Sequence, residues 1–388
     1  MISRFSLVIL SLLMSISCSS KRDQNVFSVE KLVPNSAYFS TDNNMIQYSG
    51  RIDFSSKGEA VFSMPAIKIH ARFTGPEITV YLKDLTSGGI QADGTPAQNF
   101  FNVYIDDQKP FILELSPNDS IYLLASDLVG SEHTVTLVKR TEALAGKVEF
   151  RGIWLKKGNT LMELPEKPDR KIEFIGNSIT CGYGVEAPSE NDHFGCATEN
   201  VCLSYASLTA EALQADYNIV AYSGRGVAQN YSCSLENTMP VIWDEVFPDE
   251  SRPIWNHQLF IPDVTVINLG TNDFNCSETD TSLFRKKYKK FLKAIRTTYP
   301  ETQIVCVVGP MLNDSYPVNS LSTIRYLIQS ILEQAENNGD EKLYYFEMSA
   351  QTGDLEYGAD WHPSIAQQQK NAVELTGFLA SITGWRSE

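Results

Sequence analysis

The residues of this sequence that are best placed to do chemistry lie in the stretch "YGADWHPS" near the C-terminus. Asp360 stands two positions before His362, and Pro363 biases His362 toward an extended backbone. Because alternate residues of an extended chain point to the same side, we expect the carboxylate of Asp360 to contact and orient the imidazole of His362. An imidazole oriented in this way is the usual base for a serine nucleophile.

Elimination supports His362 as the base. It is the histidine that follows a predicted strand and has an acid beside it. The chain has five histidines, and the other four lie within strands of the first half or in polar segments that do not directly follow a strand: His70, His133, His193 and His257. The alternative that stays open is an ordinary surface pair of Asp360 and His362.

A matching nucleophile is found in "GNSITCGYG". Gly176 lets the chain turn sharply after a buried strand, which places Ser178 at or just before the start of a helix with its hydroxyl at the edge of the sheet. A serine at this position also commonly caps a helix, and that alternative stays open. The chain lacks the GxSxG pattern, which argues against an α/β-hydrolase nucleophile elbow.

Acyl transfer by a serine also needs donors for the oxyanion that develops on the attacked carbonyl. Candidates are the backbone N–H of Ser178, the N–H of Gly224 in "SGRGVAQNY" and the side-chain amide of Asn272 in "GTNDFN". Gly226 is an alternative to Gly224, and spacing does not decide between them. Each glycine could also serve only a turn, and Asn272 only an Asx-turn.

The candidate residues must be positioned by the secondary structure around them, and short apolar runs that precede most of them are predicted strands. "IEFIG", "YNIVAYSG", "VTVINLG", "QIVCVVG" and "LYYFEM" alternate with segments of helical period, which predicts a parallel sheet with helices on both faces. Ligands bind beyond the carboxyl ends of such strands, where the candidate residues would meet. Two helical segments carry apolar stripes that predict core packing: Phe284, Tyr288, Phe291, Leu292 and Ile295 in the first, and Ile324, Leu327, Ile328, Ile331 and Ala335 in the second, which we expect to end at Gly339.

The first half of the chain has a different pattern. Many short runs alternate apolar and polar residues between Gly, Pro, Asn and Asp, which predicts an all-β, jelly-roll-like sandwich over residues 26–156. Residues 157–171, with two prolines among charges, are typical of a linker. The α/β domain is expected over residues 172–388.

The charge and the N-terminus limit the partners. With 32 Lys and Arg against 47 Asp and Glu, the net charge of −15 argues against nucleic acid as a partner.

Residues 1–18 have an early Arg4 and an apolar core too short to span a bilayer, which predicts a secretory signal. "SISC" resembles a lipobox, although Ser15 stands where Leu is preferred. We therefore expect an exported protein, periplasmic or at the cell surface, that contacts a membrane only through a lipid on Cys18. A plain signal peptide and a chance apolar start are the alternatives.

The cysteines after Cys18 are even in number: Cys181, Cys196, Cys202, Cys233, Cys276 and Cys306. In an exported protein this predicts one or more disulfides, and the spacing favours a bond between Cys196 and Cys202. No CxxC pair or HxxxH spacing supports a metal site.

The motifs "GNSITCGYG", "SGRG", "GTND" and "DWHPS" resemble the four blocks of the SGNH (GDSL-like) hydrolases, from about Lys171 to the end. The resemblance implies a flavodoxin-like three-layer fold with Ser178 as nucleophile, His362 as base and Asp360 as its orienter. It also implies Ser178, Gly224 and Asn272 as oxyanion donors. Asn177 replaces the usual acid of the first block, and one residue rather than two separates Asp360 from His362.

That short spacing, the "GRG" of the second block and the preceding sandwich, with "YSGRIDF", "FTG" and "VEFRGIWL", look like the family-two carbohydrate esterases. This resemblance implies a cofactor-free serine esterase that removes acetyl groups from polysaccharides such as xylan and glucomannan. Aromatic walls would suit a sugar ring, and the candidates are Trp361, Tyr231 and Trp243, although the sequence favours a core position for each. Two alternatives stay open: a lysophospholipase or thioesterase on the same scaffold, and a non-catalytic glycan-binding surface lipoprotein.

Overall fold

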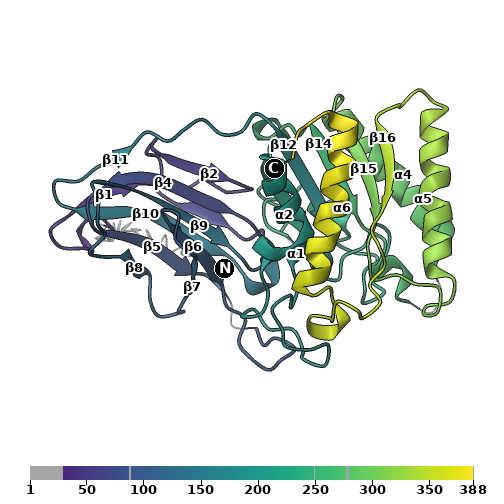
Figure 1. Ribbon diagram of the computed structural model, residues 1–388, viewed down its shortest axis with the longest axis horizontal. Helices are drawn as coiled ribbons and strands as arrows, with labels where there is room; N and C mark the ends of the chain where they lie inside the picture. The colour runs from purple at the N-terminus through teal and green to yellow at the C-terminus, as the bar shows by residue number, and fades with distance from the viewer. Residues whose placement is uncertain (1–28, 87–88, 249, 277–278, 388) are drawn as a thin grey trace, which may run out of the picture. The chain divides into compact units, whose positions relative to one another are not determined.

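The computed structural model describes residues 29–86, 89–248, 250–276 and 279–387 (Figure 1). A short 3-10 helix, η1 (Val29–Lys31), comes first, and Asn35–Glu388 forms one compact unit. The predicted signal segment with Cys18 lies outside the described residues. Among the described residues, no helix combines the length and the apolar character that a membrane crossing requires.

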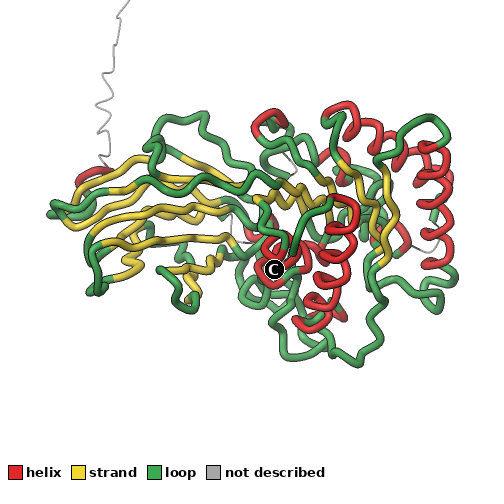
Figure 2. The backbone as a smooth tube through the Cα atoms, turned by 45° about the horizontal axis from the view of Figure 1, so that its top comes forward, coloured by secondary structure: helices red, strands yellow, loops and turns green. Residues whose placement is uncertain are grey.

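The first half of the described chain consists of short strands in two antiparallel sheets (Figure 2). One sheet has the order β1-β10-β5-β8, with β3 beside β10, and the other has the order β11-β4-β9-β6-β7, with β2 beside β4. Strand β4 shows the expected alternation, with Ile69, Ala71 and Phe73 buried. The strands are β1 (Ser36–Ser40), β2 (Ile46–Ser49), β3 (Ala60–Phe62), β4 (Lys68–Thr74), β5 (Ile78–Asp84), β6 (Phe100–Ile105), β7 (Phe111–Glu114), β8 (Ile121–Ala125), β9 (Glu132–Lys139), β10 (Val148–Lys156) and β11 (Leu161–Met162).

Two antiparallel sheets agree with the predicted all-β half, whereas the jelly-roll-like arrangement stays a prediction. Strand β11 lies within the stretch that we predicted as a linker and pairs with β4. The domain boundaries also stay predictions.

The second half contains the expected parallel sheet. Its order is β13-β12-β14-β15-β16, which is the strand order of flavodoxin-like sheets. The strands are β12 (Lys171–Gly176), β13 (Asp216–Ala221), β14 (Val264–Asn268), β15 (Gln303–Val308) and β16 (Leu343–Glu347). The helices are α1 (Ser178–Cys181), α2 (Tyr205–Ala212), α3 (Met239–Ile242), α4 (Thr281–Thr298), α5 (Ser320–Glu336) and α6 (Ile365–Thr383).

Helices cover both faces of this sheet, as alternate residues of β15 show. Ile304 and Cys306 pack in the core that contains α4 and α5, whereas Val305 and Val307 pack in the core that contains α2 and α6. The predicted stripe of α4 is buried as expected. In α5 the stripe is buried except that Ala335 is half-buried, and the helix ends at Glu336, three residues before Gly339.

A buried ion pair joins the two halves. The guanidinium of Arg51, which precedes β3, lies 3.1 Å from the carboxylate of Glu173 on β12, and both side chains are almost fully buried. Arg51 also donates to the backbone O of Trp243 and Glu245, and the indole of Trp243 donates to Glu173. Trp243 is thus a core residue, which is the alternative that the sequence favoured for it over a substrate contact.

Candidate active site

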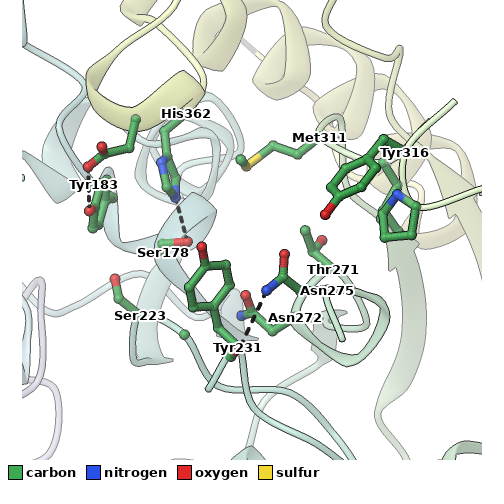
Figure 3. Close-up of a pocket in the computed structure, with 14 residues that line it drawn as sticks. Ser178, Tyr183, Ser223, Tyr231, Thr271, Asn272, Asn275, Met311, Tyr316 and His362 are labelled. Carbon is green, nitrogen blue, oxygen red and sulfur yellow. Dashed lines mark hydrogen bonds between the residues drawn. The ribbon is translucent and has the colours of Figure 1, made fainter. Parts of the chain in front are cut away.

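The serine at the carboxyl end of β12 has a hydroxyl that is free to react. Asn177 caps α1, because its Oδ1 accepts a hydrogen bond from the N–H of Ile179 at 3.1 Å. Ser178 is the first residue of α1, and its Oγ lies 2.9 Å from Nε2 of His362 (Figure 3). A Cβ on Gly176 would lie 2.0 Å from Oγ1 of Thr180, so this tight turn requires glycine. The alternative that Ser178 itself is the helix cap is therefore wrong.

His362 is held as a neutral base. Its backbone is extended before Pro363, as expected, with φ −73° and ψ 165°. Nδ1 lies 3.1 Å from the backbone O of Ala359. Since a carbonyl only accepts, Nδ1 carries the proton, and Nε2 is free to take the proton of Ser178 Oγ. Burial of the ring lowers the pKa of His362 to about 4, so the base is unprotonated at neutral pH.

The expected contact between Asp360 and the ring of His362 is not formed. Asp360 (φ 50°, ψ 40°) and Trp361 (φ 58°) adopt left-handed backbone, in the 3-10 helix η6 (Ala359–Trp361), rather than an extended chain. The rule that alternate side chains share one side therefore fails here. The carboxylate of Asp360 instead accepts hydrogen bonds from Tyr183 Oη (2.9 Å), His193 Nδ1 (2.8 Å) and the N–H of Phe194 (3.1 Å).

Asp360 reaches His362 through Tyr183. The ring of Tyr183 stacks on the imidazole with centroids 4.0 Å apart and an angle of 27° between the planes, while its hydroxyl is held by Asp360. Partial burial acts to raise the pKa of Asp360, but hydrogen bonds from His193, Tyr183 and Phe194 outweigh it and leave that pKa below its usual value. Sequence reasoning missed Tyr183 and His193. Tyr183 lies within the first motif, but its stacking partner is far away in the chain.

The structure distinguishes the two candidate glycines after β13. Gly224 has a φ of +77° and lines the same cavity as Ser178, Asn272 and His362. Gly226 does not line this cavity, and its N–H donates to Oδ1 of Asn230 at 3.2 Å. Gly224 is therefore the better-placed oxyanion donor. Asn272 begins the 3-10 helix η5 (Asn272–Phe274) and donates one amide hydrogen to the backbone O of Arg225 at 2.9 Å, which leaves the other for an oxyanion.

Asp273 supports the loop after β13 that carries Gly224 and Gly226. It lies in the motif "GTND", but the sequence alone indicated no role for it. Its carboxylate accepts hydrogen bonds from the N–H groups of Val227 (3.0 Å), Ala228 (2.7 Å) and Gln229 (3.0 Å). A Cβ on Gly226 would lie 2.4 Å from Oδ2 of Asp273, so glycine is needed there for close approach. Burial raises the pKa of Asp273 to about 6, and the three N–H groups oppose that rise.

The candidate residues line an open cavity of about 520 Å³. Its walls combine polar groups, such as Thr271 and Asn275, with the exposed rings of Tyr231 and Tyr316 (Figure 3). Tyr231 is thus placed where a substrate contact was predicted. Trp361, the other predicted contact, is 54% exposed but is not among the residues that line the cavity. Sequence reasoning missed Tyr316, which follows no strand directly.

A disulfide joins two walls of the cavity. Cys233, close to Tyr231, is bonded to Cys276, which follows Asn275, and Nδ2 of Asn275 also donates to the backbone O of Tyr231 at 3.3 Å. The expected bond between Cys196 and Cys202 is wrong. Both cysteines are free and buried, because Cys196 packs in a small cluster with Phe194 while Cys202 packs in the core beneath α2.

The comparisons with known proteins agree with this architecture. Residues 48–165 match the family described as "Carbohydrate esterase 2 N-terminal", and residues 174–370, just over half of the chain, match the "GDSL-like Lipase/Acylhydrolase family". The structure of a family two carbohydrate esterase from Clostridium thermocellum in complex with cellohexaose is 35% identical, with a TM-score of 0.80. The match covers 88% of this chain and 99% of that one. This chain belongs to the family-two carbohydrate esterases.

Two further relatives are similar to this chain over most of its length. The cellulase/esterase CelE of Acetivibrio thermocellus is 36% identical over 347 residues, which are 89% of this chain but only 40% of CelE. The chain therefore spans less than half of that relative. An acetylxylan esterase / glucomannan deacetylase of Cellvibrio japonicus is 26% identical over 342 residues, covering 88% of this chain and 89% of the relative. Membership of the family-two carbohydrate esterases confirms the predicted family and the predicted class, carboxylic ester hydrolase.

The neutral state of His362 predicts an acid limb at unusually low pH. Only the unprotonated ring can accept the proton of Ser178, and burial lowers the pKa of His362 to about 4. We expect kcat/KM for a neutral ester to rise as the pH is raised through about 4 and to reach a plateau near neutrality. A pH series with a folding control at each pH checks this; a midpoint near 6.5 would mean that the ring is solvated in the free enzyme.

Because Asp360 does not contact the ring of His362 directly, we expect its substitution to reduce kcat only modestly. We expect Asp360→Asn to lower kcat by no more than about tenfold, against about 10⁴-fold for an aspartate that bonds the catalytic histidine directly. The reason is that Ala359 O, rather than the carboxylate, accepts the Nδ1 proton. Steady-state kinetics measure the effect, and Tyr183→Phe is the matched variant because it keeps the stacked ring but loses the hydroxyl bonded to Asp360. A loss near 10⁴-fold in Asp360→Asn would contradict this geometry.

Proposed function

We propose that this family-two carbohydrate esterase removes O-acetyl groups from plant cell-wall polysaccharides or oligosaccharides such as xylan and glucomannan. The observation that carries the proposal is the hydrogen bond of 2.9 Å between Ser178 Oγ and His362 Nε2 at an open, partly aromatic cavity. An open cavity admits a polymer that cannot enter a closed tunnel. The similarity to the Cellvibrio acetylxylan esterase / glucomannan deacetylase supports the same class of substrate.

The chemistry proceeds through an acyl-enzyme. Ser178 Oγ attacks the acetyl carbonyl while His362 takes its proton, and the oxyanion accepts hydrogen bonds from Ser178 N–H, Gly224 N–H and Asn272 Nδ2. His362 then protonates the departing sugar oxygen, which breaks the ester bond and leaves acetyl on Ser178. Water, deprotonated by His362, attacks this acetyl-serine, the bond between Ser178 Oγ and the acetyl carbon breaks to release acetate, and His362 returns the proton to Oγ. The Ala359 carbonyl keeps His362 in the required tautomer, so the proposed mechanism uses a Ser–His pair with Asp360 in support through Tyr183.

The sugar would lie against the exposed aromatic residues of the cavity. Tyr231 is 61% exposed and Tyr316 is 77% exposed, on two different walls. Large rings that remain exposed in the free protein are available for contact with a ligand without loss of core packing. Trp361, which is exposed and precedes His362 in the chain, would contact sugars farther along the polymer.

Acyl-chain preference tests the proposal against a lysophospholipase or thioesterase on the same scaffold. Purified enzyme is given p-nitrophenyl esters of increasing acyl length and, in parallel, acetylated xylan and glucomannan, with NMR analysis of the products. We expect acetyl to be preferred and acetate to be released from the polysaccharides. Preference for long acyl chains would instead favour the lipid or thioester hypothesis, and polysaccharide binding without ester cleavage would favour a glycan-binding protein.

We further propose that the protein is exported and anchored by a lipid on Cys18. The support is the charged, apolar and small-residue pattern of residues 1–18 and the partial lipobox "SISC". Metabolic labelling with a fatty-acid analogue tests this, with Cys18→Ser as the matched control. Equal labelling of both proteins, or recovery of wild type without lipid, would contradict the anchor.

A further inference from the structure

A buried acidic cluster contacts the loop after β13 that carries Gly224, which we call the oxyanion loop. Glu142 follows β9 in the first half of the chain, Glu199 lies in the loop before the 3-10 helix η3 (Val201–Leu203), and Cys181 ends α1. One carboxylate oxygen from each glutamate and Sγ of Cys181 lie within 4.8 Å of one another. All three side chains, and that of Lys139, are fully buried. None of them lines the cavity, so the mechanism above does not use them directly.

Glu142 holds the residue next to the oxyanion donor. One oxygen of its carboxylate accepts from the N–H of Ser223 at 2.7 Å, and the other accepts from Ser223 Oγ. Ser223 immediately precedes Gly224 and lines the cavity itself (Figure 3). The N–H of Glu142 in turn donates to Oε2 of Glu199 at 2.9 Å. A residue of the β-rich half therefore fixes the backbone from which Gly224 N–H is presented.

The two glutamates can be neighbours only if one carries a proton. One carboxylate oxygen of Glu142 and one of Glu199 lie within 4.8 Å of each other in a fully buried site, where two negative charges would repel each other strongly. Oε1 of Glu199 has no amide, hydroxyl or cationic partner among the described residues, which identifies it as the place for the proton. Burial raises the pKa of both groups, and the charge of Glu142 raises that of Glu199 further.

A shared proton also balances the charge around the pair. Lys139 is the facing cation, with Nζ bonded to the backbone O of Thr141 and Glu142, and burial lowers its pKa only to about 8. One ionised glutamate therefore matches one ammonium group. The other groups nearby are the thiols of Cys181 and Cys196, the carboxyl of Asp84, which interacts with Lys139, and Arg140, which donates to the backbone O of Glu199 at 2.9 Å.

A metal ion fits the cluster less well than a proton does. Two carboxylates and a thiolate are a possible set of zinc ligands, but a thiol must lose its proton to bind zinc. Burial, and after it the charge of Glu142, raise the pKa of Cys181 well above its usual value, and Lys139 adds a facing positive charge.

We propose that Glu142 and Glu199 share one proton and act as a pair of positioning residues, in which the ionised Glu142 holds Ser223 and Gly224 in place and the protonated Glu199 donates to Glu142. The inference rests on the proposed acyl-transfer function of Ser178. The proposal also means that the β-rich half of the chain contributes to the reaction, because Glu142 belongs to that half and holds Ser223 of the parallel-sheet half. Neither glutamate touches the substrate.

If Glu142 and Glu199 share a proton, replacing each by glutamine should have unequal effects on kcat. Glu199→Gln keeps an oxygen for the N–H of Glu142 and an N–H for its carboxylate, so kcat should stay within about threefold of wild type. Glu142→Gln replaces an acceptor oxygen by a donor that faces Ser223, so kcat should fall by about 10- to 100-fold while KM changes little. Ser223→Ala, which loses only the hydroxyl donor, should fall between them. Glu132→Gln, which neutralises an exposed carboxylate on β9, is the control and should match wild type.

The pH dependence separates this role from a merely structural one. Because folding raises the pKa of Glu199 above its unfolded value of about 4.3, the stability that comes from the protonated pair is fully present below that pH and is lost as the pH rises through the folded pKa. Wild type should therefore lose thermal stability and kcat along an alkaline limb that Glu199→Gln lacks. Equal pH profiles in the two proteins, or an equal loss of kcat in both glutamine variants, would overturn the proposal.

Two measurements need no enzymatic activity, so they distinguish failure of this inference from failure of the proposed function. Infrared spectra should show the C=O stretch of a protonated, buried carboxyl group in wild type that is missing in Glu199→Gln. Elemental analysis of the purified protein should find less than stoichiometric metal. Absence of the carboxyl band, or a full equivalent of metal that is lost in Glu199→Gln, overturns the shared proton. Lack of ester hydrolysis with the band present contradicts only the proposed function.

Discussion

Replacing Ser178 by Ala is expected to lower kcat on an acetyl ester by about 10⁴-fold or more. The oxygen that bonds His362 Nε2 at 2.9 Å is then missing, and no acetyl-serine can form. Binding and the oxyanion donors remain, so a small residual rate above that of water is also expected. Steady-state kinetics and mass spectrometry of the enzyme after a brief exposure to substrate, which detects the acetyl group on Ser178, measure the effect.

Ser381→Ala is the matched control for this substitution. Ser381 is an exposed serine near the C-terminal end of α6, and about 24 Å of helix separates it from the start of α6 beside His362. Its loss should leave kcat unchanged. Activity in Ser178→Ala equal to that of wild type, with folding intact, would eliminate Ser178 as the nucleophile and with it the acyl-enzyme mechanism.

The second large effect is expected at Asn272. Asn272→Ala should lower kcat by about 10²- to 10³-fold with little change in KM, because the amide contributes to the bound oxyanion more than to the bound ester. Asn272 is buried, lines the cavity with Ser178, and is held by its bond to the backbone O of Arg225. The geometry of its free N–H is therefore set before the substrate binds. Comparing kcat and KM separately is the decisive measurement.

Asn275 provides the control on the same cavity wall. Its amide donates one hydrogen to the backbone O of Tyr231, and Asn275 is not one of the proposed oxyanion donors. Asn275→Ala should thus change kcat by less than about threefold and act mainly on KM, through the position of Tyr231. If both variants lost kcat alike, the effect would come from disturbance of the wall and not from an oxyanion donor at Asn272.

Much of the fold follows from local patterns in the sequence. Apolar residues at a period of two place Ile69, Ala71 and Phe73 on one buried face of β4, and a helical period buries Phe284 and Ile295 of α4. These periods act over a few residues and need no distant partner. The carboxyl ends of parallel strands share one edge of a sheet, and for this reason the sequence pattern alone predicts that Ser178, Asn272, His362 and one of the two glycines Gly224 and Gly226 meet.

The same local reasoning failed where the backbone left its usual conformation. Asp360 was expected to contact His362 because the chain was taken as extended, but its φ of 50° and that of Trp361 at 58° direct the carboxylate to Tyr183 and His193. Left-handed conformations of residues other than glycine are uncommon and are selected by the surrounding contacts. No signal in "DWHPS" indicates them.

The tertiary structure alone decided which residues far apart in the chain contact each other. Cys233 pairs with Cys276 rather than with a neighbour in sequence, and Glu142 holds Ser223, because folding brings their segments together. Local sequence patterns predicted the strands of the parallel sheet, the two longer helical stripes and the residues that stand at the strand ends, but not strand β11. Only the packed structure decided which of those residues touch, since a hydrogen bond or a disulfide depends on distances of a few ångströms that sequence spacing does not encode.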